Sequence, residues 1–265
     1  MGEIDKFYWN LGRAFVGMST LLAIVGPIGN FMILLTTIKT SSMRTTCNFL
    51  IAMCAVGDIL HQCGVIVVQL PILFNFHFEI SSYLCNCLMF LPEMGITIGC
   101  VCVLLIGFDR LFSVIFAVSY KSRDKTVNHI AIAAVLFSSC LHVCYVMYAY
   151  YTPRIGICEI LTPFADGLPY FTFPILAVNI LSVLVYLIVW IRLRMEADAI
   201  MMKRIFKSLL IIVTVDASGW LITPFFIYLI LHSALDDSLK FAWSYFGTNF
   251  INIALSIKIF VYYTT

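Results

Sequence analysis

Charged residues are scarce in this sequence. Asp, Glu, Lys and Arg make up 11% of its 265 residues, while 62% of the residues are apolar. Soluble domains carry about 25% charged residues, so this chain lacks the polar surface that a soluble fold needs. The net charge of +2 is too small to indicate nucleic-acid binding. We therefore expect a membrane protein whose length is divided into spans of about 20 residues.

Several short motifs are absent as well. The sequence has no Asn-x-Ser/Thr sequon, no cysteine pair with zinc-ligand spacing and no Ser/His/Asp set for catalysis. Residues 1–13 mix acidic and basic side chains and lack the pattern of a cleavable signal peptide, so we expect the first span to direct its own insertion. We expect no amphipathic helix after the last span. These features predict that the protein is not an enzyme and holds no cofactor or metal.

Long apolar runs dominate what is present. They are continuous and lack the period-two alternation of barrel strands, so they predict helices. We expect one domain over residues 1–265, an all-α bundle of seven transmembrane helices. No internal repeat is evident, and an odd number of spans argues against a simple duplicated transporter. The expected spans are residues 14–38, 47–74, 86–118, 128–151, 168–191, 205–231 and 241–263.

The charges between the spans are unevenly distributed. The basic residues that follow odd-numbered spans are Lys39, Arg44, Lys121, Arg123, Lys125, Arg192, Arg194, Lys203, Arg204 and Lys207. Those on the other side are Lys6, Arg13, Arg154 and Lys240. Because loops rich in Lys and Arg stay in the cytoplasm, we expect the N-terminus outside and the C-terminus inside.

Ionisable side chains within apolar spans are costly, so each is a candidate functional residue. Asp58, Glu93, Asp216 and Lys258 lie on four different spans, and we expect them to be isolated from one another. Isolated charges form no polar pathway, so a transporter or ligand-gated channel is the less favoured alternative. A retinal photoreceptor is a third alternative, but Lys258 lies too near the inner end of its span.

Asp109 and Arg110 stand at the inner end of the third span. One interpretation is an interfacial charge pair whose long side chains reach water. The other is a switch, in which Arg110 folds back onto the carboxylate of Asp109 and is released to meet a cytoplasmic partner. The residues alone leave both interpretations open.

The run Ile106-Gly-Phe-Asp-Arg-Leu-Phe-Ser-Val-Ile-Phe-Ala-Val-Ser-Tyr120 resembles the end of helix three in rhodopsin-like (class A) G-protein-coupled receptors. Gly29-Asn30 and the stretch that ends in Asp58 resemble the same family. The resemblance implies a receptor that signals by an outward movement of span six and engages a heterotrimeric G protein.

A narrower resemblance rests on the part of this run that reads Gly107-x-Asp-Arg-Leu-x-Ser-Val-x-Phe116 and on other segments. Thr46-Cys-Asn-Phe-Leu-Ile, the run Asp58-Ile-Leu-His-Gln-Cys-Gly64 and the closing Phe260-Val-Tyr-Tyr263 are similar to the nematode serpentine chemoreceptor class called SRSX. This similarity implies a chemosensory receptor for a small molecule or short peptide. It also implies a plasma-membrane location, for example in the cilia of sensory neurons.

The resemblance implies a disulfide bond between Cys85, at the outer end of span three, and Cys158, in the loop between spans four and five. Both are expected outside, where oxidation is favoured. Cys87 is a competing partner. The other cysteines are expected to be free and to pack as small apolar groups; they are Cys47, Cys54, Cys63, Cys100, Cys102, Cys140 and Cys144.

In the family, the acid that Asp58 matches holds a sodium ion or a cluster of waters; the alternative is a hydrogen bond between Asp58 and Asn30. Span seven departs from the family, because Lys258-Ile-Phe-Val-Tyr262 replaces the usual Asn-Pro-x-x-Tyr. Either Lys258 turns inward and pairs with Asp58, replacing the sodium site, or it reaches the cytoplasmic headgroups. Tyr262 matches the tyrosine of the family's coupling switch.

Span six carries Trp220 and Pro224 four residues apart, where the family usually has two. Pro224 can kink the helix and serve as a hinge. A ligand would bind among the outer halves of the helices in a mostly apolar pocket. Glu93 is the expected anchor; it pairs with an amine, is protonated, or forms a hydrogen bond to a neighbouring helix. The expected pocket walls are Phe90, Met94, Tyr170, Phe173, Trp220 and Tyr228.

Overall fold

Helices make up most of the described chain. The structure is a computed structural model that describes residues 3–40, 45–74, 79–116, 120, 125–160, 162–195 and 200–264, without the side chains of 3–4, 125–128, 165–166, 200–205, 207–208, 231, 259 and 262–264. Its long helices are α1 (Glu3–Lys39), α2 (Thr46–Phe74), α3 (Ser82–Ile115), α5 (Lys125–Ala149), α6 (Leu168–Met195), α7 (Ile200–Leu231) and α8 (Asp237–Thr264).

Each of the seven predicted spans overlaps one of these helices. Six of the helices within the described residues are long and apolar enough to cross a membrane, and α8 is the one that falls short. The polar residues of α8 explain its lower hydropathy: Asn249, Asn252, Ser256 and Lys258 are all buried against other helices. An inward polar face is compatible with a helix that meets lipid only on its other side.

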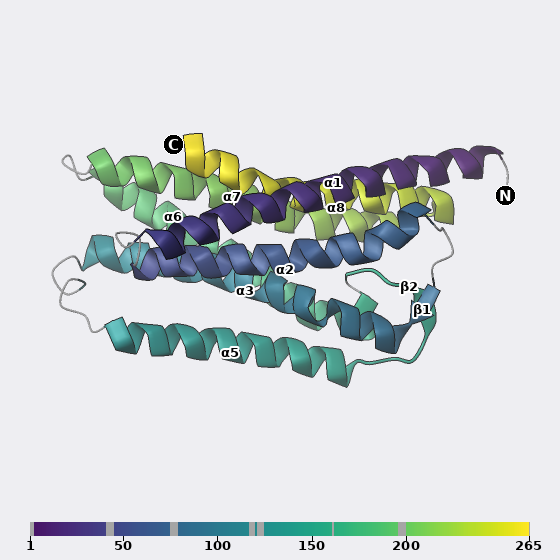
Figure 1. Cartoon of the computed structure of the whole chain (residues 1–265), viewed down its shortest axis with the longest axis horizontal. Coiled ribbons are helices and arrows are strands. Elements are labelled where there is room, and N and C mark those ends of the chain that lie inside the picture. The colour runs from purple at the N-terminus through teal and green to yellow at the C-terminus, as the bar shows by residue number, and fades with distance from the viewer. Residues whose placement is uncertain are drawn as a thin grey trace.

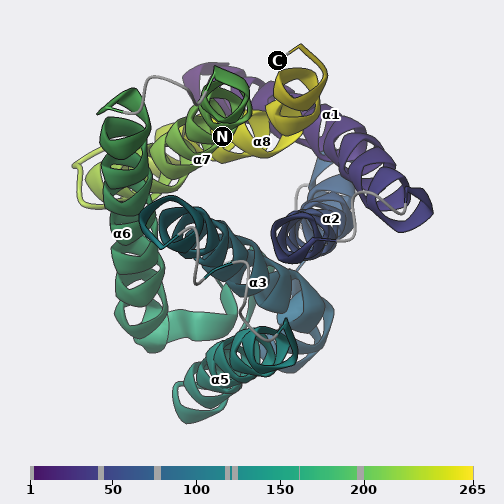
Figure 2. The same ribbon diagram turned by 90° about the vertical axis from the view of Figure 1, so that its left-hand side faces the viewer.

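The helices form an elongated, roughly parallel bundle (Figure 1). Seen end-on, α1, α2, α3, α6, α7 and α8 follow one another around a ring, and α5 lies outside the ring against α3 (Figure 2). The N-terminus lies at one end of the bundle and the C-terminus towards the other (Figure 1).

Helices α2 and α3 cross at small residues. A Cβ atom added to Gly57 would lie 2.6 Å from the carbonyl oxygen of Gly95, and one added to Gly95 would lie 2.5 Å from the carbonyl oxygen of Gly57. Small residues allow this approach of two membrane helices. The crossing brings Asp58 and His61, which follow Gly57 on α2, against the middle of α3.

A seam of hydrogen bonds joins α8 to α1 and α2. The Asn252 side-chain amide donates to Ser19 Oγ at 2.7 Å, and Gln69 Nε2 donates to the same oxygen at 3.1 Å. Gln62 Nε2 donates to Ser256 Oγ, also at 3.1 Å. Such bonds between polar side chains stabilise helix association where lipid provides no hydrophobic driving force.

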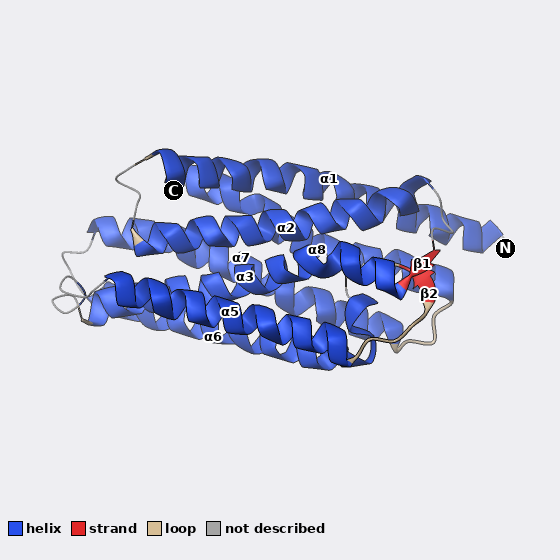
Figure 3. Ribbon diagram, turned by 60° about the horizontal axis from the view of Figure 1, so that its bottom comes forward, coloured by secondary structure: helices blue, strands red, loops and turns tan. Residues whose placement is uncertain are grey.

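A small antiparallel sheet covers one end of the bundle (Figure 3). Strand β1 (Glu79–Ser81) pairs with β2 (Ile155–Ile157), with Ile80 opposite Gly156. The short 3₁₀ helix η2 (Thr162–Gly167) follows β2. We call this end the sheet end. Because α3 begins beside β1 and runs away from it, Arg110 lies at the opposite end, which we call the Arg110 end.

Candidate functional site

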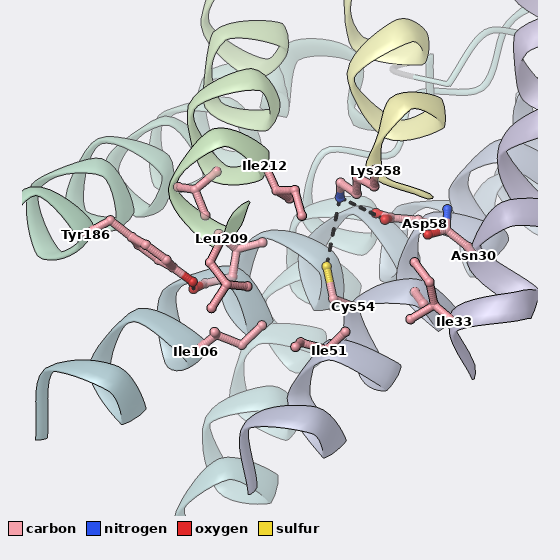
Figure 4. Close-up of a pocket in the computed structure, with 13 residues that line it drawn as sticks. Asn30, Ile33, Ile51, Cys54, Asp58, Ile106, Tyr186, Leu209, Ile212 and Lys258 are labelled. Atoms are coloured by element: carbon pink, nitrogen blue, oxygen red, sulfur yellow. Dashed lines mark hydrogen bonds and ion pairs between the residues drawn. The ribbon is translucent and has the colours of Figure 1, made fainter. Parts of the chain in front are cut away.

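Three charged side chains from three helices meet inside the bundle. Lys258 Nζ on α8 lies 2.8 Å from Asp58 Oδ2 on α2 and 3.2 Å from Asp216 Oδ1 on α7. The side chains of Lys258, Asp58 and Asp216 are 5%, 5% and 3% exposed. Figure 4 shows Lys258 between Asp58 and the sulfur of Cys54, from which its nitrogen lies 3.9 Å. We call Lys258, Asp58 and Asp216 the central cluster.

The central cluster corrects the prediction that these ionisable residues are isolated. Spans that are far apart in the sequence converge in the ring, so Asp58, Asp216 and Lys258 share one site, and Lys258 takes the inward of its two predicted orientations. The alternative hydrogen bond from Asn30 to Asp58 is not formed. Asn30 is buried nearby (Figure 4), but its Nδ2 has no acceptor among the described residues, and the bond to Asp58 Oδ2 comes from Lys258.

Two small cavities adjoin the central cluster. One, of about 20 Å³, reaches Asn30 and Tyr186; the other, of about 10 Å³, lies between Asp58, His61, Asp216 and Trp220. A cavity needs roughly 10–15 Å³ to hold one water molecule, so both are of water size. The charges alone show what the site can do chemically: an ammonium ion, fixed to the chain, supplies positive charge between two carboxylates.

At the Arg110 end, Arg110 folds back onto its neighbour. Arg110 Nη2 lies 2.6 Å from Asp109 Oδ2, and the hydroxyl of Tyr120 donates to Asp109 Oδ1 at 2.8 Å. Burial and the bond to the Asp109 carboxylate raise the pKa of Tyr120 to about 12, so this hydroxyl stays protonated at neutral pH. The side chain of Tyr262 lies outside the described residues.

A third cavity, of about 40 Å³, adjoins Arg110. Its walls come from α3, α6 and α7, and its lining residues are Arg110, Ser113, Val114, Val189, Leu193, Phe206 and Leu209. Arg110 is therefore partly accessible at a junction of three helices, while its charge is matched by Asp109.

At the sheet end, Cys85 of α3 forms a disulfide bond with Cys158, and their Cα atoms are 5.6 Å apart. Cys87 is a free, exposed cysteine. Beside the disulfide, the backbone N–H of Ser82 donates to the carbonyl of Arg154 at 2.8 Å. The segment after α5 is thus attached to the start of α3 by a covalent bond and by backbone pairing.

A family model described as serpentine type 7TM GPCR chemoreceptor Srsx matches residues 23–265. The chain belongs to this Srsx family. The match begins within α1 and includes the central cluster, Arg110 and both disulfide cysteines. The protein is therefore a seven-transmembrane chemoreceptor and a multi-pass membrane protein, and it belongs to a family of receptors rather than enzymes.

In this Srsx receptor, the predicted ligand anchor Glu93 is fully buried, at 0% exposure. Neither of its carboxylate oxygens has a hydrogen-bond partner among the described residues. Met94 is buried as well, in an apolar cluster with Phe164 of η2, whose ring stacks on Phe171 with centroids 3.9 Å apart. Trp220 lines the cavity beside Asp58.

The four other predicted wall residues have a different position. Phe90, Tyr170, Phe173 and Tyr228 are all exposed. None of these rings lines the three cavities described above, so their role in ligand binding stays a prediction. A membrane helix is apolar on its lipid side as well as on its inner side, so hydropathy does not reveal which rings face inward.

The proposed hinge lies within α7, where Pro224 is eight residues from Asp216 towards the sheet end. Next to it, Thr223 Oγ1 donates to the carbonyl of Gly247 on α8 at 3.1 Å. Three further side chains lie at these places in the Srsx receptor: Tyr120 beside Asp109, His61 beside the cavity at Asp58, and Phe164 beside Met94. Tyr120 and His61 stand within the family-like runs of the sequence, whereas no sequence motif marks Phe164.

Proposed function

We propose that this receptor binds a small molecule or short peptide from outside the cell and signals through a heterotrimeric G protein. The observation that supports coupling is the position of Arg110, held by Asp109 beside a cavity between α3, α6 and α7. Outward movement of the Arg110 end of α7 widens that cavity. Release from Asp109 then lets Arg110 meet the G protein.

The central cluster provides a way to couple the two ends. Asp216 lies on α7 between Pro224 and the Arg110 end, so a swing about Pro224 moves its carboxylate relative to Lys258. The ligand acts by binding one of the two arrangements more tightly than the other. In this proposal, Lys258 replaces the sodium ion that the family resemblance implies at Asp58.

The proposal places the receptor in the plasma membrane of a sensory cell, with the sheet end outside the cell and the Arg110 end in the cytoplasm. An epitope tag before Met1 is expected to stain intact cells. Staining that requires permeabilised cells would contradict this orientation and, with it, the coupling of Arg110 to a cytoplasmic partner.

Function is tested by a second-messenger assay in cells that express a mixture of G proteins, against odorants, amines and short peptides. An active compound is expected to lose its effect in Arg110→Ala at unchanged surface expression. Lys39→Ala, which removes an exposed cation at the same end, is expected to respond as the wild type does. A compound-dependent current in cells that lack G proteins would instead favour a ligand-gated channel.

A further inference from the structure

We propose that Glu93 and His61 form the polar part of the ligand site, and that this site takes a small amine whose positive charge pairs with the Glu93 carboxylate. The inference rests on the proposed receptor function and specifies its ligand class. It starts from two side chains that are buried inside the bundle and whose polar atoms have no hydrogen-bond partner among the described residues.

The burial of the Glu93 carboxyl group supports the proposal more strongly than that of His61. It is 0% exposed, and both of its oxygens lack a hydrogen-bond partner among the described residues. No ion pair between Glu93 and a described Lys, Arg or His is formed within 4.0 Å. Burying a carboxyl group without a partner is costly, so its presence calls for a donor that the chain itself does not supply.

His61, on the neighbouring helix α2, is also buried without a hydrogen-bond partner among the described residues. Both of its ring nitrogens are buried and have no hydrogen-bond partner within the described part of the chain. The ring lies 6.0 Å from that of Trp220, measured between centroids, and lines the cavity that Asp58 and Asp216 also line. An imidazole can donate or accept a hydrogen bond, and here it is free to do either.

The proposal places these two side chains in one site because both lie near the crossing of α2 and α3. At the helix crossing, a Cβ atom on Gly95 would lie 2.9 Å from the backbone nitrogen of His61, and Gly95 is two residues from Glu93. Ile96 and Cys100 of α3 line the cavity beside His61. Glu93 precedes Ile96 by three residues, and residues at that spacing share a helix face. Glu93 therefore lies on the face of α3 that carries Ile96, about one turn nearer the sheet end, and is not itself among the residues that line the cavity.

The charges around the cavity favour a cation. An ammonium ligand would supply the positive charge that a buried carboxylate needs in order to be ionised, together with hydrogen-bond donors for its two oxygens. At the far wall, two carboxyl groups share the single ammonium of Lys258, so groups that can carry negative charge outnumber the positive one. The ring of Trp220 adds an aromatic face that attracts cations.

The size of the cavity connects this site to signalling. At about 10 Å³ it has room for a water-sized group alone. An amine ligand therefore needs a wider arrangement of the helices, and Trp220 and Asp216, which form one wall, both belong to α7. A ligand that binds only the wider form shifts the receptor towards the state in which α7 has moved.

The test uses purified full-length receptor in lipid nanodiscs, without G protein, and pairs of small amines and alcohols of equal carbon skeleton. At least one amine is expected to raise the thermal unfolding temperature, and its alcohol is not. Glu93→Gln is expected to weaken that amine's binding by about 10- to 100-fold, the range for a lost charged hydrogen bond. Glu79→Gln, which neutralises an exposed carboxylate on β1, is the matched control and is expected to bind normally.

Three outcomes would overturn the site: no amine of the panel binds, amine and alcohol bind equally, or Glu93→Gln binds like the wild type. An amine that binds but raises no second messenger contradicts the proposed function and leaves the site intact. A neutral agonist that acts fully on Glu93→Gln contradicts the site and leaves the function intact.

A second measurement needs no ligand. Glu93→Met replaces the unpartnered carboxyl group with an apolar side chain of similar length. If the carboxyl serves a ligand and not the fold, this variant unfolds at a higher temperature than the wild type in the absence of ligand. A lower unfolding temperature would show that Glu93 stabilises the folded receptor, and would contradict its assignment as a ligand anchor.

Discussion

The carboxylate of Asp216 lies 3.2 Å from the ammonium of Lys258, and this contact joins α7 to α8 in the interior of the bundle. Lys258 also bonds to Asp58 at 2.8 Å, so the loss of Asp216 would still leave the ammonium paired. The two contacts are therefore unequal in their consequences: one can open when α7 moves, while the other keeps the charge of Lys258 compensated.

Asp216→Asn is expected to raise the basal second-messenger level without agonist. The substitution removes the charge that attracts α7 to Lys258, so the arrangement with α7 moved outward becomes more populated. Loss of about 1 kcal/mol from the resting state corresponds to a roughly fivefold rise in that population. Thr214→Ala, which changes an exposed residue on the same helix, is the control. A basal level equal to that of the control would show that Asp216 does not restrain α7.

Lys258→Ala is expected to destabilise the folded receptor by about 3–5 kcal/mol, because it leaves two buried carboxylates without their counter-charge. The measurement is the thermal unfolding temperature of receptor purified in detergent. Removing all three charges, with Lys258→Met, Asp58→Asn and Asp216→Asn together, is expected to recover most of the loss. A triple variant no more stable than Lys258→Ala would indicate that packing, and not charge, is responsible.

The same variant tests the replacement of sodium. The wild-type receptor is expected to unfold at the same temperature in sodium chloride and in choline chloride, because Lys258 already supplies the cation. Lys258→Ala is expected to unfold at a higher temperature in sodium, which can enter between the free carboxylates. Unchanged sodium sensitivity and signalling in Lys258→Ala would count against the pairing of Lys258 with Asp58.

Cys85→Ser and Cys158→Ser are each expected to lower surface expression strongly. Removing a native disulfide from small secreted domains costs about 2–5 kcal/mol, and this one attaches the segment after α5 to α3. Cys87→Ser, two residues away on the same helix, leaves the disulfide in place and is expected to be expressed normally. The measurement is antibody staining of intact cells, and equal loss in Cys87→Ser would contradict the specific role of the Cys85–Cys158 bond.

The positions of the helices could be predicted from the sequence because the bilayer fixes the length of an apolar span. The predicted first span began at residue 14, whereas α1 begins at Glu3, since a helix can continue beyond the hydrocarbon where hydropathy no longer marks it. The pairing of Cys85 with Cys158 was implied by the family resemblance, and the structure contains it.

The meeting of Asp216 with Lys258 could not be predicted in the same way. It depends on how α7 is rotated about its axis, and an almost uniformly apolar helix carries little periodic signal of that rotation. The exposure of Phe173 and Tyr228 could not be predicted from the sequence for the same reason. Ionisable residues are the exception, because an ionisable side chain exposed to lipid is energetically unfavourable and therefore faces the interior of the bundle. Glu93, Asp58 and Lys258 can be identified from the sequence for this reason.

Tyr120→Phe is expected to raise basal signalling, since it removes the hydroxyl that donates to Asp109 Oδ1 at 2.8 Å and so loosens the carboxylate that holds Arg110. A hydrogen bond to a charged group contributes about 1.5–3 kcal/mol, of which part appears as a shift towards the released state. The effect is expected to disappear in Asp109→Asn, where the charged acceptor is already lost, and this double-mutant comparison is the measurement that decides. Equal effects of Tyr120→Phe in both backgrounds would show that the tyrosine acts independently of Asp109.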